Sequence, residues 1–490
     1  NQLRSRGRGA RKRLLLKGAG MPISDKHNEY DIYGPQWRRI RDCIAGEDAV
    51  KGSTTRHLPR PENMLPDQYD AYITRAMFYG ATGRTLAGLS GAVFRKRPIV
   101  QVPDRLRDAL SNITLTGVPF DTFAQRAVEE TLALGRYGVL VDRPPEEDGR
   151  AYMRGYPAES ICNWRTVTTN GSEKLEQIIL SEKGTRTTDD GFGSTSYDRF
   201  RVLELDGEGY YHVRVFVEGR DVDTFILDEE YTPTKRGERL DYIPFQFFGP
   251  TDLSPTVEKS PLIDLANVNI SHYRTSADLE QGNYLTSQPT PYITGMRADH
   301  AGDFPIGSGA MWLLPEGAEA GMLEYKGAGL SYLENSLSRK QGMMAQLGAR
   351  LLEDQKRAVE AADTVRLRSS GESSVLANLA NSCSMGLSQC LEWVTDWEGA
   401  NAELVEVQLN TDFMDTRMEP PEMRELVSAW QSGAIPTDDL IYNLQRGEIL
   451  RPDFTIEEVK DMLAGNETPI IGKALDLGDD AGPATSIAAE

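Results

Sequence analysis

Two long helices, predicted near the middle of the chain, constrain its fold more than any other feature. The first begins at Ser260-Pro261, where serine caps free backbone N–H groups and proline fits the first turn, and it ends near Gly282. The second begins at Ser331, which forms a capping box with Glu334. Each helix has roughly 24 residues and, at ~1.5 Å per residue, is about 36 Å long. Helices of this length that are apolar along one side need neighbours, and a ring of identical subunits would supply them.

The second helix carries apolar residues at spacings of three and four, which is typical of a helix buried along one side. A third helix, predicted from about Ser373 to Trp397, carries a similar stripe beside a face of small residues. This stripe fits core packing or a subunit contact better than a cofactor site. The predicted subunit-contact residues of the two stripes are Leu330, Leu333, Leu337, Met344, Leu347, Leu351, Leu376, Leu379 and Leu387.

The net charge of −20 limits the kinds of function that this chain of 490 residues can have. Such an excess of acidic groups repels phosphate, which argues against a protein that clamps nucleic acid by bulk charge neutralisation. The four cysteines form no CxxC pair and no zinc spacing, so we expect buried, reduced thiols. No apolar run approaches the ~18 residues of a transmembrane helix, so we expect no membrane partner.

A chain of this length should hold two or more structural units. Residues 1–20 are basic and contain no acid, so we predict a disordered leader there. Residues 21–257 place helices before a series of strands, which indicates an α+β unit with an antiparallel sheet. Its clearest strand is the apolar run Tyr137–Asp142, and the stretch 183–197 is predicted to be a hairpin tip.

The segments after the first long helix also differ in composition. Residues 286–327 are rich in proline and glycine, which indicates a compact module of small strands between the two long helices. Residues 353–370 are charged and contain few large apolar side chains. Residues 419–490 hold short helices, and Thr455 and Glu458 form a predicted capping box for the last of them.

The sequence holds no motif of a known catalytic centre. It has no Gly-rich phosphate loop ending in Lys-Ser or Lys-Thr, no HExxH and no GxSxG. The five histidines are scattered, and His272 on the first long helix has no second ligand one turn away. We therefore expect a protein that is not an enzyme and has no cofactor and no metal site.

The order of these parts resembles the portal proteins of tailed bacteriophages, and so does the local sequence. Ser260–Ala266 resembles the start of the portal stem helix. Gly307–Pro315 resembles the glycine-led strand of the portal clip, and Ser369–Leu376 resembles the turn after the tunnel loop. Trp37–Gly46 resembles one uncharacterised branch of the family, and the resemblance covers roughly residues 21–465.

The resemblance implies an α+β portal fold with a wing of helices and antiparallel sheet, a stem of long helices, a small α/β clip and a helical crown. The implied parts are a wing at 21–257, stem helices at 258–285 and 328–352, a clip at 286–327, a tunnel loop at 353–370, a long helix with its return to the wing at 371–418, and a crown with a flexible C-terminus at 419–490.

The resemblance also implies a function in the virion. A ring of about twelve subunits, assembled in the host cytoplasm, would form the portal vertex of the capsid and the channel for double-stranded DNA packaging and ejection. Its implied partners are the terminase large subunit, the major capsid protein and a head-tail adaptor protein. The residues implied to face DNA are Lys356, Arg357, Arg366 and Arg368. A few such cations give weak, exchangeable phosphate contacts while the acidic ring repels the duplex.

Two other interpretations remain open from the residues. A different ring-forming virion protein, such as an adaptor, would form rings that do not engage a packaging motor. A metal-dependent nuclease would use Asp142, Asp221 and Asp223. Because Asp221 and Asp223 lie in a predicted strand and turn, a solvated acidic pair is the commoner explanation for them.

Overall fold

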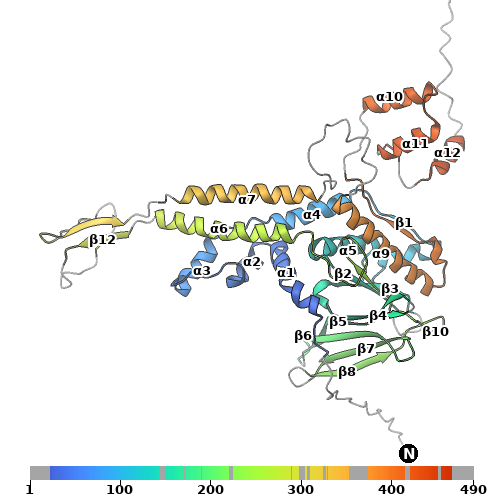
Figure 1. Cartoon of the computed structure of the whole chain (residues 1–490), viewed down its shortest axis with the longest axis horizontal. Helices are drawn as coiled ribbons and strands as arrows, with labels where there is room; N and C mark the ends of the chain where they lie inside the picture. Colours follow the sequence, from blue (N-terminus) through green and yellow to red (C-terminus); the bar gives the residue numbers. More distant parts are fainter. Residues whose placement is uncertain are drawn as a thin grey trace, which may run out of the picture. The chain divides into compact units, whose positions relative to one another are not determined.

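The computed structural model describes residues 23–143, 149–169, 171–188, 190–219, 224–287, 290–296, 304–305, 310–323, 327, 329–351, 374–413, 420–447, 449–450 and 454–465. The chain divides into two compact units, Asn1–Phe413 and Met414–Glu490. The first unit combines helices with antiparallel sheets, so the predicted α+β class is confirmed (Figure 1). Its first elements are α1 (Asn28–Ala45), α2 (Glu47–Gly52), η1 (Thr54–Arg56), α3 (Pro66–Arg75), α4 (Ala81–Val93), β1 (Ile99–Gln101), η2 (Asp104–Asn112) and α5 (Phe120–Leu134).

Gly135 ends α5 and allows a later segment to approach closely. Its φ of 71° lies in the left-handed region, which glycine adopts without strain. A Cβ at this position would lie 2.8 Å from the carbonyl oxygen of Glu258 and 3.0 Å from the backbone nitrogen of Ser260. The Ser260 hydroxyl donates to the carbonyl oxygen of Ala133 at 2.5 Å. The backbone that leads into the first long helix therefore packs against the end of α5 and is hydrogen-bonded to it.

Two antiparallel sheets follow α5 in the chain. The three-stranded sheet has the order β11-β2-β3, and every residue of β2 is buried, as its apolar run predicts. The five-stranded sheet has the order β4-β5-β6-β7-β8. Because β5 ends at Thr187 and β6 begins at Ser194, the hairpin tip predicted at 183–197 is confirmed. The strands are β2 (Tyr137–Asp142), β3 (Tyr152–Pro157), β4 (Ile161–Thr169), β5 (Ser172–Thr187), β6 (Ser194–Leu205), β7 (Tyr211–Glu218), β8 (Phe225–Tyr231) and β11 (Phe245–Phe248), with η3 (Ala158–Ser160) after β3 and the short pair β9 (Thr234–Lys235) and β10 (Glu238–Arg239) after β8.

The two long predicted helices are α6 (Ile263–Ser287) and α7 (Leu330–Arg350), with 25 and 21 residues. They run side by side as an antiparallel hairpin, and β12 (Thr290–Thr294) and β13 (Glu319–Leu323) pair at its far end (Figure 1). The predicted capping box at the start of the second helix is wrong. Gly329 is the N-cap residue of α7, and no side chain of the described residues caps this end.

Helix α6 is buried on most of its sides as far as Gly282, whereas the sequence predicted burial of one side. It packs against α1, α3, α4 and α7. Several of its buried side chains are polar and small enough to lie between helices. Asn269, which is fully buried, accepts from the Thr82 N–H at 3.1 Å and donates to the Tyr79 carbonyl at 2.7 Å. Buried polar groups can form hydrogen bonds of this kind inside the protein. The hydrophobic pattern of a helix that contains them therefore does not show how much of the helix is buried.

Helix α9 (Val375–Trp397) is the predicted third helix and lies in the core of the first unit. Ser374 caps it by accepting from the Ala377 N–H at 3.1 Å, one residue after the predicted start. The helix packs against α5, β2 and β11. After η5 (Ala402–Leu404), strand β14 (Glu406–Gln408) pairs with β1.

The second unit is helical in its described residues. Thr455 and Glu458 form the capping box predicted there: the Thr455 hydroxyl accepts from the Glu458 N–H at 3.2 Å, and the Glu458 carboxylate accepts from the Thr455 N–H at 2.8 Å. The three helices are α10 (Pro420–Gln431), α11 (Thr437–Arg446) and α12 (Ile456–Gly465).

All four cysteines are buried and unpaired, which confirms the prediction of buried thiols. Burial raises the pKa of Cys43 and Cys383 to about 12 and that of Cys162 to about 11, and it raises the pKa of Cys390 well above its ordinary value. Because the thiolate is the reactive form, a thiol-reactive dye should label none of them in the native protein and all four in urea. Rapid labelling of the native protein would contradict this placement.

Candidate assembly surface

The apolar stripe predicted on the second long helix faces α6 of the same chain. Leu330 lies over Gly282, where an added Cβ would lie 2.5 Å from Leu330 Cδ2. On the same face, Lys340 donates to the Ser271 carbonyl at 3.0 Å. Met344 is buried and the other stripe residues are half-buried, so α6 and the core already cover this stripe in one chain. The inward-facing stripe residues are Leu330, Leu333, Leu337, Met344, Leu347 and Leu351.

The structure corrects the subunit-contact prediction for the third helix. Leu376, Leu379 and Leu387 are fully buried in the core of the single chain. Their apolar spacing indicates a buried face, and the sheet and α5 of the same chain bury it. These three side chains therefore cannot reach a neighbouring subunit.

The outward face of α7 is exposed in the single chain. Tyr332 is 78% exposed and Met343 is 44% exposed, although both are large and apolar. Arg339, Gln346 and Arg350 lie at helical spacing on the same exposed face. An aromatic ring, a methionine and arginines are the side chains that protein interfaces favour.

The tip of the hairpin exposes a denser set of apolar side chains. Strands β12 and β13 form a two-stranded ribbon, in which the ring of Tyr292 lies over Gly321 on the opposite strand. A ribbon of two strands is at best marginally stable in water, because neither face is covered. We therefore expect a partner to cover this tip. Its exposed large apolar residues are Tyr292, Met311, Leu313, Met322 and Leu323.

The four cations predicted to face DNA lie outside the described residues, so that prediction stays a prediction. They are Lys356, Arg357, Arg366 and Arg368.

Asp142, which the nuclease interpretation required, lies in a buried ionic cluster. Arg201 lies 3.5 Å from the Asp142 carboxylate and donates to the Glu182 carboxylate at 2.9 Å. Tyr231 donates to Asp142 at 3.2 Å, and Tyr156 donates to Glu182 at 2.6 Å. All three charged side chains are almost fully buried.

This environment suits structure better than catalysis. Burial raises the pKa of Asp142, and the charge of Arg201 opposes that rise. Burial also opposes ionisation of Glu182, but Arg201 and Arg154 outweigh it and lower its pKa. Asp221 and Asp223 lie outside the described residues. Within the described ranges, no group of three or more histidine, cysteine, aspartate or glutamate side chains could hold a metal ion.

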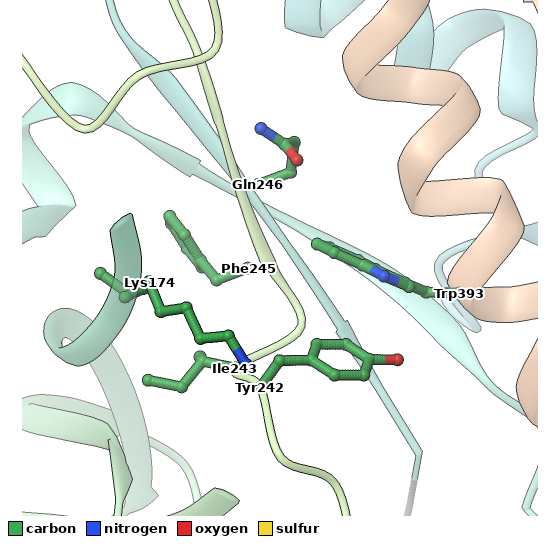
Figure 2. A pocket seen from close by; sticks show the side chains of 7 residues that line it. Lys174, Tyr242, Ile243, Phe245, Gln246 and Trp393 are labelled. Atoms are coloured by element: carbon green, nitrogen blue, oxygen red, sulfur yellow. The ribbon is translucent and has the colours of Figure 1, made fainter. Parts of the chain in front are cut away.

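A cavity of about 310 Å³ lies between α9, β5 and β11 with the two residues Tyr242 and Ile243 before it. Figure 2 shows Trp393, from α9, on one side and Lys174 and Phe245 on the other. The rings of Tyr242 and Trp393 lie 5.7 Å apart. Burial, together with Asp396 and Asp241, raises the pKa of Tyr242 to about 12, so its phenol stays neutral at neutral pH. The cavity offers flat apolar walls and suits binding of a side chain better than acid–base chemistry.

The hairpin and α9 coincide with a match to a known family of sequences. Residues 261–398 match the family described as "Domain of unknown function (DUF4055)". Among curated proteins, none matches this chain. In the part of the chain that the structure describes, no helix is long and apolar enough to cross a membrane.

The chain is also similar to solved structures of gene transfer agent (GTA) particles. One is titled "Neck of native GTA particle computed with C12 symmetry", at 14% identity and a TM-score of 0.36, covering 80% of this chain and 96% of that one. Another is titled "Virion of native gene transfer agent (GTA) particle", at 13% identity and a TM-score of 0.37, covering 82% and 98%. TM-scores below 0.5 do not establish a common fold.

Proposed function

We propose that the chain is a subunit of a portal-like ring at one capsid vertex of a phage-like particle, through which double-stranded DNA enters and leaves. The observation that carries the proposal is the hairpin of α6 and α7, which ends in a ribbon with exposed apolar side chains. The order of parts along the sequence also supports it, because a helical and sheet unit precedes the hairpin and short helices follow. The hairpin is the stem and the ribbon belongs to the clip.

The outward face of α7 makes the lateral contact between subunits. Tyr332 and Met343 pack against a different surface of the next copy, so the contact is head-to-tail. Head-to-tail contacts close into a ring when the rotation between copies divides a full turn, and the resemblance implies about twelve copies.

The tip is the docking surface for other particle proteins. Its exposed apolar ribbon binds the terminase large subunit during packaging and the head-tail adaptor protein afterwards. The helical and sheet part of the first unit meets the major capsid protein. The motor supplies the energy of DNA movement, in keeping with a sequence that carries no phosphate-loop motif.

DNA passes through the ring without being held. Each chain carries a net charge of −20, so the ring repels phosphate over most of its surface. The loop cations Lys356, Arg357, Arg366 and Arg368 give a few weak phosphate contacts per subunit. Contacts to phosphate alone carry no sequence preference, as a DNA channel requires.

Negative-stain electron microscopy of the purified chain tests the proposal. We expect rings with a central hole and a sedimenting species many times heavier than the 54.4 kDa chain. A monodisperse monomer at physiological salt would refute the ring. Rings that form but bind no packaging motor would support a different ring-forming virion protein instead.

A further inference from the structure

A second cavity, of about 450 Å³, lies where α1, η1 and α6 meet. Its lining gathers four arginines from three separate segments of a chain whose net charge is −20. The polar residues of this lining are Arg38, Arg39, Arg56, His57, Asn267 and Arg274. Such a concentration of positive charge attracts anions, although water screens part of it.

The one carboxylate bonded to this lining, among the residues that the structure describes, is Asp42. It accepts from Arg56 at 3.2 Å and from the His57 Nε2–H at 2.7 Å. Burial lowers the pKa of His57 despite the nearby Asp42, so the imidazole is neutral at neutral pH. Arg56 therefore neutralises the charge of Asp42, and Asp42 does not compensate the positive charge of the other three arginines.

Those three arginines form no ion pair in the described part of the chain. Arg39 donates to the side-chain oxygen of Asn267, and Arg274 donates through Nε to the His57 carbonyl at 2.6 Å. These two hydrogen bonds to neutral groups orient the guanidinium planes without neutralising them. Arg38 lines the same cavity. Arg38, Arg56 and Arg274 are exposed, and Arg39 is half-buried.

We propose that this cavity binds a phosphate group. Guanidinium groups donate paired N–H bonds that match the oxygens of phosphate, and charge-assisted bonds of this kind are roughly twice as strong as neutral ones. Arg38, Arg39 and Arg274 bring three such groups to one cavity. A phosphate dianion bound among them removes their mutual repulsion. Inorganic phosphate and the nucleic-acid backbone both supply this chemistry, and the site does not depend on the proposed portal function.

Isothermal titration calorimetry of the full chain with inorganic phosphate at low ionic strength tests the site. We expect saturable binding, and a loss of about a hundredfold in affinity in the Arg39→Gln/Arg274→Gln variant, which lacks two charge-assisted contacts. The matched control is Arg105→Gln/Arg107→Gln on η2, which changes the net charge equally at exposed positions and should leave phosphate affinity unchanged. Arg38→Gln, which breaks no hydrogen bond of the described chain, serves if the first variant does not fold.

A short DNA duplex then separates the two sources of phosphate. Displacement of bound phosphate by the duplex assigns the site to the nucleic-acid backbone, whereas phosphate binding that the duplex leaves unchanged assigns it to the free anion. The proposal is overturned if the wild-type chain does not bind phosphate saturably, or if the η2 control loses affinity equally. It is also overturned if Arg39→Gln/Arg274→Gln binds phosphate normally but assembles poorly, because a carboxylate of a second copy would then occupy the cavity.

Discussion

The Tyr332→Glu/Met343→Glu variant should remain a folded monomer where the wild-type chain forms a ring. Both side chains are exposed in the single chain, so the substitutions should not disturb its core. In the assembled ring each interface would bury two unpaired carboxylates, at a cost of several kcal/mol per charge. Since about 1.4 kcal/mol is a tenfold change in affinity, subunit association should weaken by at least a factor of about a hundred.

Analytical ultracentrifugation measures this change, and thermal melting shows that the fold is retained. Tyr442→Glu/Met462→Glu is a matched control, because these residues are a similarly exposed tyrosine and methionine on α11 and α12. It introduces the same charge and should still assemble. If the α7 variant sediments like the wild-type ring, the outward face of α7 is not the lateral contact.

Arg201→Met should strongly destabilise the first unit. It leaves Asp142 and Glu182 buried without their shared cation, and breaking a buried ion pair from one side costs about 3–5 kcal/mol. Urea unfolding measures the loss. Arg165→Met is the control: its pair with Glu176 is solvent-exposed, and exposed pairs contribute only about 0–1 kcal/mol. Equal stability of the two variants would show that the cluster is not structural.

The pH dependence of this difference has a definite sign. In the wild-type chain the pKa of Glu182 is below its ordinary value, so its stabilising contribution is present at neutral pH and lost as the pH falls through that pKa. Arg201→Met removes a cation that lowers this pKa. The difference in unfolding free energy between wild type and variant should therefore shrink in acid, and a difference that grows in acid would contradict the assignment.

Local sequence patterns predicted the positions of helices and strands well, but they did not predict which segments pack against them. The run Tyr137–Asp142 predicted β2, and the apolar spacing after Ser373 predicted α9 to within two residues. Spacing shows that a helix has a buried face, but it does not show what buries it. For this reason the leucines of α9 were assigned to a neighbouring subunit, whereas α5 and the strands of the same chain cover them.

The charged sites could not be predicted because their residues are far apart in the sequence. Arg39, Arg56 and Arg274 come together only when α6 packs against α1 and η1. Asp142 and Arg201 likewise meet across two sheets. No local spacing marks either group. The sequence predicted a module of small strands at the tip, but it did not predict that the apolar side chains of the tip are exposed. Exposure depends on which other segments pack against the tip, and a local pattern does not show this.

The contact at Gly135 has a mechanical consequence. Because the backbone before α6 lies against the end of α5 with no side chain between them, that junction has little room to bend. A force applied along the hairpin axis would pass into α5 and the strands behind it instead of being absorbed at a hinge. A methyl group at position 135 would push the two backbone segments apart. The stiffness of the junction between α5 and the hairpin therefore depends on a residue without a side chain.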